Sequence, residues 1–280
     1  SVRRGGCGTM AAPPGFNGRT EMFKDEVTAV GNAAKGKINL LEHNFTGYIM
    51  MSLLAGLYIA LGSILMGIVG GVFTGGGSYA TKLACGIVFS VGLCFVTMGG
   101  AELFTGNNLV MTIGGLKKTV TWGQVAKLWI VCWIGNLVGS VIAAAIFTMT
   151  GIPGSGDIGA FFANTAAAKM GGSAANLFSK AILCNICVCV AIWCGTKLKS
   201  EGAKIAMNFC CVTTFVTCGF EHSIANMTFL SIGLMNQNGV AGITMGGFFY
   251  NLLIVTLGNM VGGILFVAIP YYLIAKAKEN

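Results

Sequence analysis

The sequence predicts an all-α polytopic membrane protein with six transmembrane helices, arranged as two inverted repeats of three helices each. Three observations predict this fold class. The chain is 55% hydrophobic and only 9% charged, with a mean hydropathy of +0.78, whereas soluble domains carry about 25% charged residues. One polar motif occurs twice within otherwise apolar sequence. Lysines are concentrated between alternate apolar segments, as in chains that cross a membrane several times.

The duplicated motif has the pattern Gly-x-Glu-x-x-x-Gly/Ala-Asn. It reads GAELFTGN at 100–107 and GFEHSIAN at 219–226, 119 residues later. A second matched pair follows at an offset of 123 residues, as GNLVG at 135–139 and GNMVG at 258–262. Two matched pairs in the same order indicate an internal duplication with one polar motif in each half.

The first residues of the chain are set apart from the rest by composition. Residues 1–21 are rich in Gly and Pro, and we expect them to be the remainder of an expression tag. Residues 22–280 are expected to form a single transmembrane domain. Within residues 22–46, apolar residues recur at helical spacing among charged ones, which predicts an amphipathic N-terminal helix on the membrane surface.

Six apolar segments follow, each long enough to cross about 30 Å of hydrocarbon or to do so with one interruption. Repeat 1 covers residues 47–150 and repeat 2 covers residues 177–280. The polar motif interrupts the second and fifth segments, so we expect both of these helices to be broken. The connection 151–176 is expected to be a long loop. The spans are expected at 47–73, 83–116, 125–150, 177–195, 203–235 and 246–275.

The distribution of lysines predicts the orientation of the chain in the membrane. From Met22 onward, eleven lysines lie on the side of the two termini, and three, Lys82, Lys169 and Lys180, lie on the other. By the positive-inside rule, both termini are cytoplasmic. Three spans per repeat is an odd number, so the two repeats are inserted with opposite orientation, as in transporters whose broken helices meet near the midplane.

The two breaks predict a path through the membrane. A break is tolerated at this depth only where it is buried in protein or faces a water-filled cavity, because unsatisfied amides cost several kcal/mol in lipid. Glu102 and Glu221 occupy matching positions in the two motifs, as do Asn107 and Asn226. We interpret these four residues as structural, with the glutamates capping the broken backbone.

His222 has no counterpart in the first motif, where Leu103 occupies its place. Its unperturbed pKa of about 6.5 makes histidine the side chain that titrates nearest neutral pH. An ionisable residue within a membrane segment is a functional candidate. Because scaffolding would be expected in both repeats, we interpret His222 as a pore-lining residue.

These motifs, together with TWGQ at 121–124 and Met227 after the second break, resemble those of the formate/nitrite transporter family. The resemblance extends from Met22 to Lys278 and is greatest to the hydrosulfide channel branch. It implies an aquaporin-like, homopentameric channel in the cell inner membrane, with one pore per protomer for hydrosulfide, formate or nitrite. We expect no enzyme activity, cofactor or metal site, and no nucleic-acid partner; the partners are small monovalent anions and the lipid bilayer.

The resemblance also implies roles for individual residues. His222 matches the central pore histidine, with Thr105 and Asn185 as polar partners, and Lys169 matches an outer vestibule lysine. Lys37 is a candidate for gating at the inner mouth. Hydrophobic constrictions are expected on both sides of the histidine, from Phe89, Leu93 and Phe215 towards the cytoplasm and from Leu103 and Phe104 towards the outside.

Two mechanisms are compatible with these residues. Lys169, expected to be unpaired in a loop poor in charge, would concentrate anions by Coulomb attraction. His222 would then either stabilise the anion between the constrictions or donate a proton so that the neutral acid crosses. The same residues serve both mechanisms, and the sequence does not choose between them. We favour anion passage assisted by transient protonation of the histidine.

Other function classes fit the sequence less well. An aquaporin would carry Asn-Pro-Ala at both breaks, whereas Asn107 and Asn226 are followed by Asn108 and Met227. Ammonia channels usually line the pore with two histidines. A secondary transporter would need more intramembrane carboxylates than the two symmetric glutamates. An integral-membrane enzyme would need a catalytic constellation, and the chain has only two histidines, which lie far apart.

Overall fold

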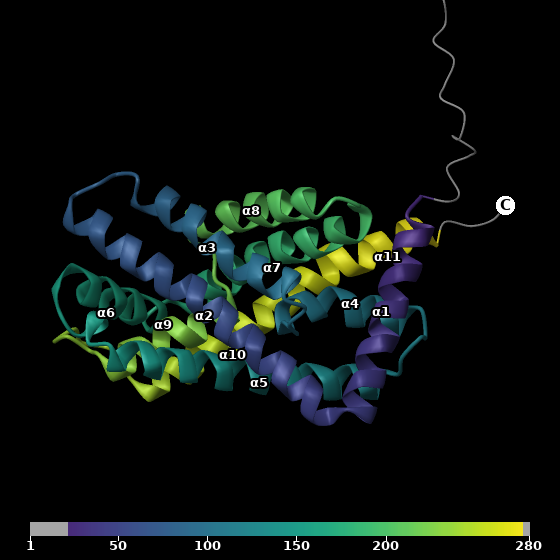
Figure 1. The fold of residues 1–280 in the computed structure, drawn as a ribbon, viewed down its shortest axis with the longest axis horizontal. Coiled ribbons are helices and arrows are strands. Elements are labelled where there is room, and N and C mark those ends of the chain that lie inside the picture. The colour runs from purple at the N-terminus through teal and green to yellow at the C-terminus, as the bar shows by residue number, and fades with distance from the viewer. Residues whose placement is uncertain (1–21, 277–280) are drawn as a thin grey trace, which may run out of the picture.

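The computed structural model describes residues 22–276; the expected tag remainder, 1–21, and the last four residues lie outside the described part. Helices account for nearly all of this part of the chain, joined by short connections (Figure 1). In chain order they are α1 (Lys24–His43), α2 (Phe45–Gly75), α3 (Thr81–Met98), α4 (Phe104–Leu116), α5 (Trp122–Met149), the 3-10 turn η1 (Ile152–Gly154), α6 (Gly156–Met170), α7 (Ala174–Lys197), α8 (Glu201–Thr217), α9 (Ser223–Met235), α10 (Met245–Gly263), the π-helical turn η2 (Ile264–Ala268) and α11 (Ile269–Ala275).

Five helical segments among the described residues are long and apolar enough to cross a membrane. They are α2, α3, α5, α7 and the continuous segment Met245–Ala275, with mean hydropathies between 1.8 and 2.4. The prediction of an all-α membrane protein is confirmed. The remaining apolar sequence is divided between α8, with 17 residues, and α9, with 13.

Two helices are interrupted, at the places where the duplicated motif occurs. The first break separates α3 from α4 at residues 99–103, and the second separates α8 from α9 at residues 218–222. The first glycine of each motif, Gly100 or Gly219, has a φ of +70°. Only glycine adopts this left-handed conformation without a steric penalty, which explains why both motifs begin with it.

The GNxxG motifs lie where long helices touch. α5 packs against α2, and α10 packs against α7. A Cβ atom at Gly139 would overlap the carbonyl oxygen of Leu53, and one at Gly262 would overlap that of Ile182. Small residues therefore let these backbones approach closely, as is common between membrane helices.

The N-terminal helix α1 lies across one end of the bundle, transverse to the long helices (Figure 1). Its apolar side chains, including Val30, Ala34 and Leu41, are buried, and α4 is its main neighbour. The predicted helix and its apolar face are thus present, and its position on the membrane surface stays a prediction. The residues recur at the spacing of one helical face, and that face packs against the protein itself.

The prediction of a long loop at 151–176 is wrong, because this connection contains the fifteen-residue helix α6. Phe162 and Ala166, one turn apart, are fully buried. The Phe162 ring fills the space over Gly67 of α2 that a Cβ atom would occupy. This spacing of buried residues was the available signal for a helix, but small residues elsewhere in the segment weakened it.

Replacing Gly139 by alanine tests the close packing of α5 on α2. We expect Gly139→Ala to lower the free energy of unfolding by about 2 kcal/mol, because the added methyl group forces the helices apart. The measurement is the thermal unfolding midpoint in detergent micelles. Gly36→Ala in α1 is the matched control, since nothing lies within 4 Å of a Cβ there. Equal midpoints for the two variants would contradict this account of the motif.

Candidate functional site

The first break is held in place by Asn136 of α5. Its Oδ1 accepts the backbone N–H of Phe104, the first residue of α4, at 2.9 Å. Its Nδ2 donates to the carbonyl oxygens of Ser52 at 2.6 Å and Glu102 at 2.9 Å. One buried side chain thus satisfies backbone groups of the break and of α2.

Asn259 of α10 makes the same three bonds at the second break. Its Oδ1 accepts the N–H of Ser223, the first residue of α9, at 2.9 Å. Its Nδ2 donates to the carbonyl oxygens of Ala181 at 2.8 Å and Glu221 at 2.9 Å. Asn136 and Asn259 occupy equivalent positions in the two GNxxG motifs. Both motifs therefore combine close-packing glycines with an asparagine that binds the broken backbone.

The two glutamates bind side chains instead of capping the backbone. Glu102 forms an ion pair with Lys37 of α1. Its Oε2 also accepts hydrogen bonds from Asn107 Nδ2 at 3.0 Å and from the Tyr48 hydroxyl at 3.3 Å. Within residues 22–276, no backbone N–H donates to either glutamate side chain. The capping role expected of Glu102 and Glu221 is thus wrong. Asn136 and Asn259, the asparagines of the GNxxG motifs, bind the broken backbone in their place.

Glu221 has an equivalent set of partners at the second break. Its Oε2 accepts from Lys169 Nζ at 2.8 Å and from Asn226 Nδ2 at 2.6 Å. Asn226 Nδ2 also donates to Asn251 Oδ1 at 2.8 Å. Lys169 lies in the last turn of α6, so the expectation of an unpaired lysine in a loop is wrong on both counts. Its charge is largely balanced by Glu221.

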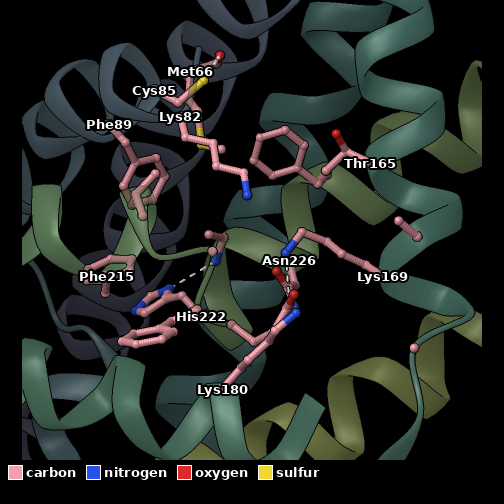
Figure 2. Close-up of a pocket in the computed structure, with 18 of the residues that line it drawn as sticks. Met66, Lys82, Cys85, Phe89, Thr165, Lys169, Lys180, Phe215, His222 and Asn226 are labelled. Atoms are coloured by element: carbon pink, nitrogen blue, oxygen red, sulfur yellow. Dashed lines mark hydrogen bonds and ion pairs between the residues drawn. The ribbon is translucent and has the colours of Figure 1, made fainter. Parts of the chain in front are cut away.

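His222 lies at the N-terminus of α9 and is only 3% exposed. Its Nδ1 accepts the backbone N–H of Ala225 at 3.1 Å. A backbone N–H can only donate, so a neutral ring carries its proton on Nε2. Nε2 lies 3.0 Å from Thr105 Oγ1 and in this tautomer donates to it. The imidazole also stacks on Phe215, with ring centroids 5.9 Å apart (Figure 2).

Asn185 of α7 contacts this pair through the backbone. Its Nδ2 donates to the carbonyl oxygens of Thr105 at 3.3 Å and Asn259 at 2.7 Å. Cys189, one turn further along α7, also donates to the Thr105 carbonyl, at 3.5 Å. Asn185 therefore positions the start of α4 and makes no hydrogen bond to the imidazole. Nothing in the sequence singled out Cys189 among the other cysteines.

Two cavities approach the His222–Thr105 hydrogen bond. The first, the Lys169 cavity, has a volume of about 560 Å³ and is lined by Lys169, Glu221 and His222 among others (Figure 2). The second, the Lys37 cavity, has a volume of about 500 Å³. Leu103 and Gly106, which flank Phe104 and Thr105 in the sequence, line this second cavity. His222 thus lines the first cavity, and its partner Thr105 lies in the chain between residues that line the second.

The predicted constriction residues are buried, but they do not lie on the expected sides of the histidine. Phe89 and Phe215 were expected on the side away from Lys169, and Leu103 on the same side as Lys169. Phe89 and Phe215, with ring centroids 6.0 Å apart, line the Lys169 cavity. Leu103 lines the Lys37 cavity. The reason is the direction of α3, which begins beside the Lys169 cavity, so that Phe89 precedes the break by more than two turns. Phe104 lines a third, apolar cavity between α5 and α10.

Leu93 is buried one turn after Phe89 on α3. Residues four apart lie on the same face of a helix, so Leu93 continues the face of Phe89 towards the break. Irregular backbone at membrane depth that faces cavities is a feature of transport proteins. A membrane transport protein is therefore the class that the fold and the site define.

Comparison with known proteins gives the family. The family model for the formate/nitrite transporter matches residues 24–273, and the chain belongs to this family. The nitrite transporter NirC of Salmonella typhimurium is 34% identical over 92% of this chain and 94% of its own length. The relatives found are described as transporters and channels, and the chain accordingly is not an enzyme.

Two solved structures resemble the fold described above. A protein described as an FNT family ion channel has a TM-score of 0.85 and 32% identity, covering 90% of this chain and 99% of that one. A pentameric formate channel with formate bound has a TM-score of 0.70 and 29% identity, covering 82% of this chain and 96% of that one.

A double-mutant cycle tests the ion pair between Lys169 and Glu221. We expect Glu221→Gln to lower the free energy of unfolding by about 3 kcal/mol, because it leaves the largely buried Lys169 ammonium without its partner. Adding Lys169→Gln should recover part of the loss, since no unpaired charge then remains. Unfolding midpoints of the four proteins give the coupling. Additive losses would show that the pair is not coupled.

Proposed function

We propose that the protein is a channel for small monovalent anions, of which hydrosulfide is the preferred one and formate and nitrite are others. The observation that carries the proposal is the approach of two cavities to a single buried hydrogen bond, between His222 and Thr105. The names of the relatives, which include nitrite transporters and formate channels, support this class of substrate. The preference for hydrosulfide rests on the motif resemblance.

The proposed architecture is a single channel domain, residues 22–280, that crosses the inner membrane six times as two inverted repeats. The matching hydrogen bonds of Asn136 and Asn259 support the repeat. The excess of lysines near the termini supports cytoplasmic ends. We also propose a homopentamer with one pore per protomer, on the basis of the pentameric formate channel. In this orientation, the Lys169 cavity is the outer vestibule and the Lys37 cavity the inner one.

The proposed pore combines apolar walls with one polar step. Phe89, Leu93 and Phe215 form the outer constriction, and Leu103 forms the inner one, whereas Phe104 faces the third cavity between α5 and α10. An anion that enters such walls loses hydration, which is costly unless hydrogen-bond donors replace the water. The donors proposed are His222 Nε2 and the Thr105 hydroxyl, positioned by Asn185. Lys169, in its ion pair with Glu221, forms part of the wall of the outer vestibule.

The contacts of His222 favour passage of the anion beside a neutral histidine over the transient protonation that we favoured from the sequence. A proton on Nδ1 would face the Ala225 N–H and break the cap of α9. It would also place positive charge at a helix N-terminus, where the helix dipole disfavours cations. We therefore propose that His222 remains neutral and stabilises the passing anion by hydrogen bonding from Nε2. Lys37 is proposed to control the inner mouth, because its pair with Glu102 joins α1 to the first break.

Uptake of anions into proteoliposomes tests the proposed function. We expect hydrosulfide, formate and nitrite each to enter faster than into protein-free liposomes, with hydrosulfide fastest. His222→Asn should lower the rates about tenfold, whereas His43→Asn, at an exposed position in the last turn of α1, should leave them unchanged. A tenfold loss corresponds to about 1.4 kcal/mol, near the upper end of the range for one ordinary hydrogen bond. Rates equal to those of empty liposomes would exclude the channel.

The pH dependence of uptake tests the neutral state of His222. Asparagine is a good N-cap, so His222→Asn should fold normally although it lacks Nε2. If His222 stays neutral, wild type and variant should differ in rate by the same factor at pH 6 and at pH 8, values on either side of the usual histidine pKa of about 6.5. A rate ratio that changes strongly with pH would show that the histidine titrates during transport.

A further inference from the structure

The Lys169 cavity is lined by other positively charged side chains in addition to Lys169. Besides Lys169, it is lined by Lys82 from the first turn of α3 and by Lys180 from α7. Figure 2 shows Lys82 extending into the cavity from the wall opposite Lys169. Glu221 is the one carboxylate among the lining residues. Apart from His222, the lining thus has a net charge of +2, from three lysines and one glutamate.

The pairing of Lys169 changes which lysines attract anions. Its ammonium lies 2.8 Å from Glu221, so the two charges largely cancel at a distance. Within residues 22–276, no carboxylate lies within 4.0 Å of either Lys82 or Lys180. Asp157 lines an adjoining cavity, which shares Thr74, Phe161, Thr165 and Ala168 with this one. The uncompensated charge therefore belongs to Lys82 and Lys180.

The Lys37 cavity differs from the Lys169 cavity in the net charge of its lining. Its charged lining residues are Lys37 and Lys204, balanced by Glu102 and Glu201. The two cavities are equivalent in their central ion pairs, but the lining of the Lys37 cavity has no net charge. Because both cavities have comparable volumes, the difference in charge is the main electrostatic distinction between the two mouths.

We propose that Lys82 and Lys180, and not Lys169, are the residues that attract anions into the Lys169 cavity. The inference rests on the proposed function and identifies the residues that determine how fast an anion enters. A cavity of one charge sign with low-dielectric walls concentrates counter-ions and raises their entry rate by a factor of ten or more. Lys82 is exposed and Lys180 partly exposed, so dissolved salt screens their attraction over a Debye length of about 10 Å at 0.1 M.

The experiment measures formate uptake into proteoliposomes at formate concentrations well below half-saturation, as a function of ionic strength set by an impermeant salt. We expect the wild-type rate to fall as ionic strength rises. Lys82→Gln/Lys180→Gln should lower the rate about tenfold at low salt and abolish most of its salt dependence. The rates of the two proteins should converge at high salt. Lys82→Arg/Lys180→Arg, which retains both charges, should behave as wild type.

Two controls separate these lysines from the others. Lys127→Gln removes an exposed lysine of α5 that lines neither cavity, and it should leave the salt dependence unchanged. Lys169→Gln/Glu221→Gln removes the central pair without altering the net charge of the cavity. Normalised to its own rate at high salt, this variant should keep the wild-type salt dependence.

Two outcomes distinguish the failure of the inference from the failure of the proposed function. If wild type takes up formate and the Lys82/Lys180 glutamine variant retains the full salt dependence, the inference alone is overturned. It is also overturned if the Lys169/Glu221 variant loses that dependence. If wild type takes up no anion faster than empty liposomes, the proposed function and the inference fail together.

Discussion

The need to satisfy broken backbone inside a membrane protein is the constraint on which the rest of this structure depends. A helix break exposes amide and carbonyl groups that lipid cannot bind, and here two asparagines bind them. Asn136 and Asn259 each make three hydrogen bonds that join a long helix, a break and a neighbouring helix. These bonds fix the first residues of α4 and α9. They therefore also fix Thr105 and His222, which lie within two residues of those helix starts.

Once the asparagines hold the backbone, the glutamates are available for a different task. Each accepts from an asparagine of its own motif and from a lysine of a peripheral helix, Lys37 on α1 or Lys169 on α6. Both peripheral helices are thereby coupled to a break through a largely buried ion pair. Loss of one partner would leave a buried charge, so displacement of α1 or α6 has an energetic consequence at the centre of the protein.

Much of this fold followed from sequence, and the errors have identifiable causes. The glycines of the two motifs predicted both breaks, since glycine adopts the φ of +70° found at Gly100 and Gly219 without steric cost. The lysine partners of the glutamates were not predictable, because they lie 65 and 52 residues away in the chain. The reversed side of Phe89 was predictable in principle: it follows Lys82 by two helical turns, a rise of about 10 Å.

In the proposed pore, the difference between the two breaks explains why one histidine would be sufficient. At equivalent places, His222 caps α9 with its Nδ1, whereas Leu103 precedes α4 without a side-chain cap and lines the Lys37 cavity. Leu103 keeps the wall of the Lys37 cavity apolar. The imidazole of His222 offers Nε2 on the other side of the proposed pore. A second polar side chain at Leu103 would hold the anion more tightly on both sides. Passage requires binding weak enough to allow release, and one donor pair between apolar walls meets that requirement.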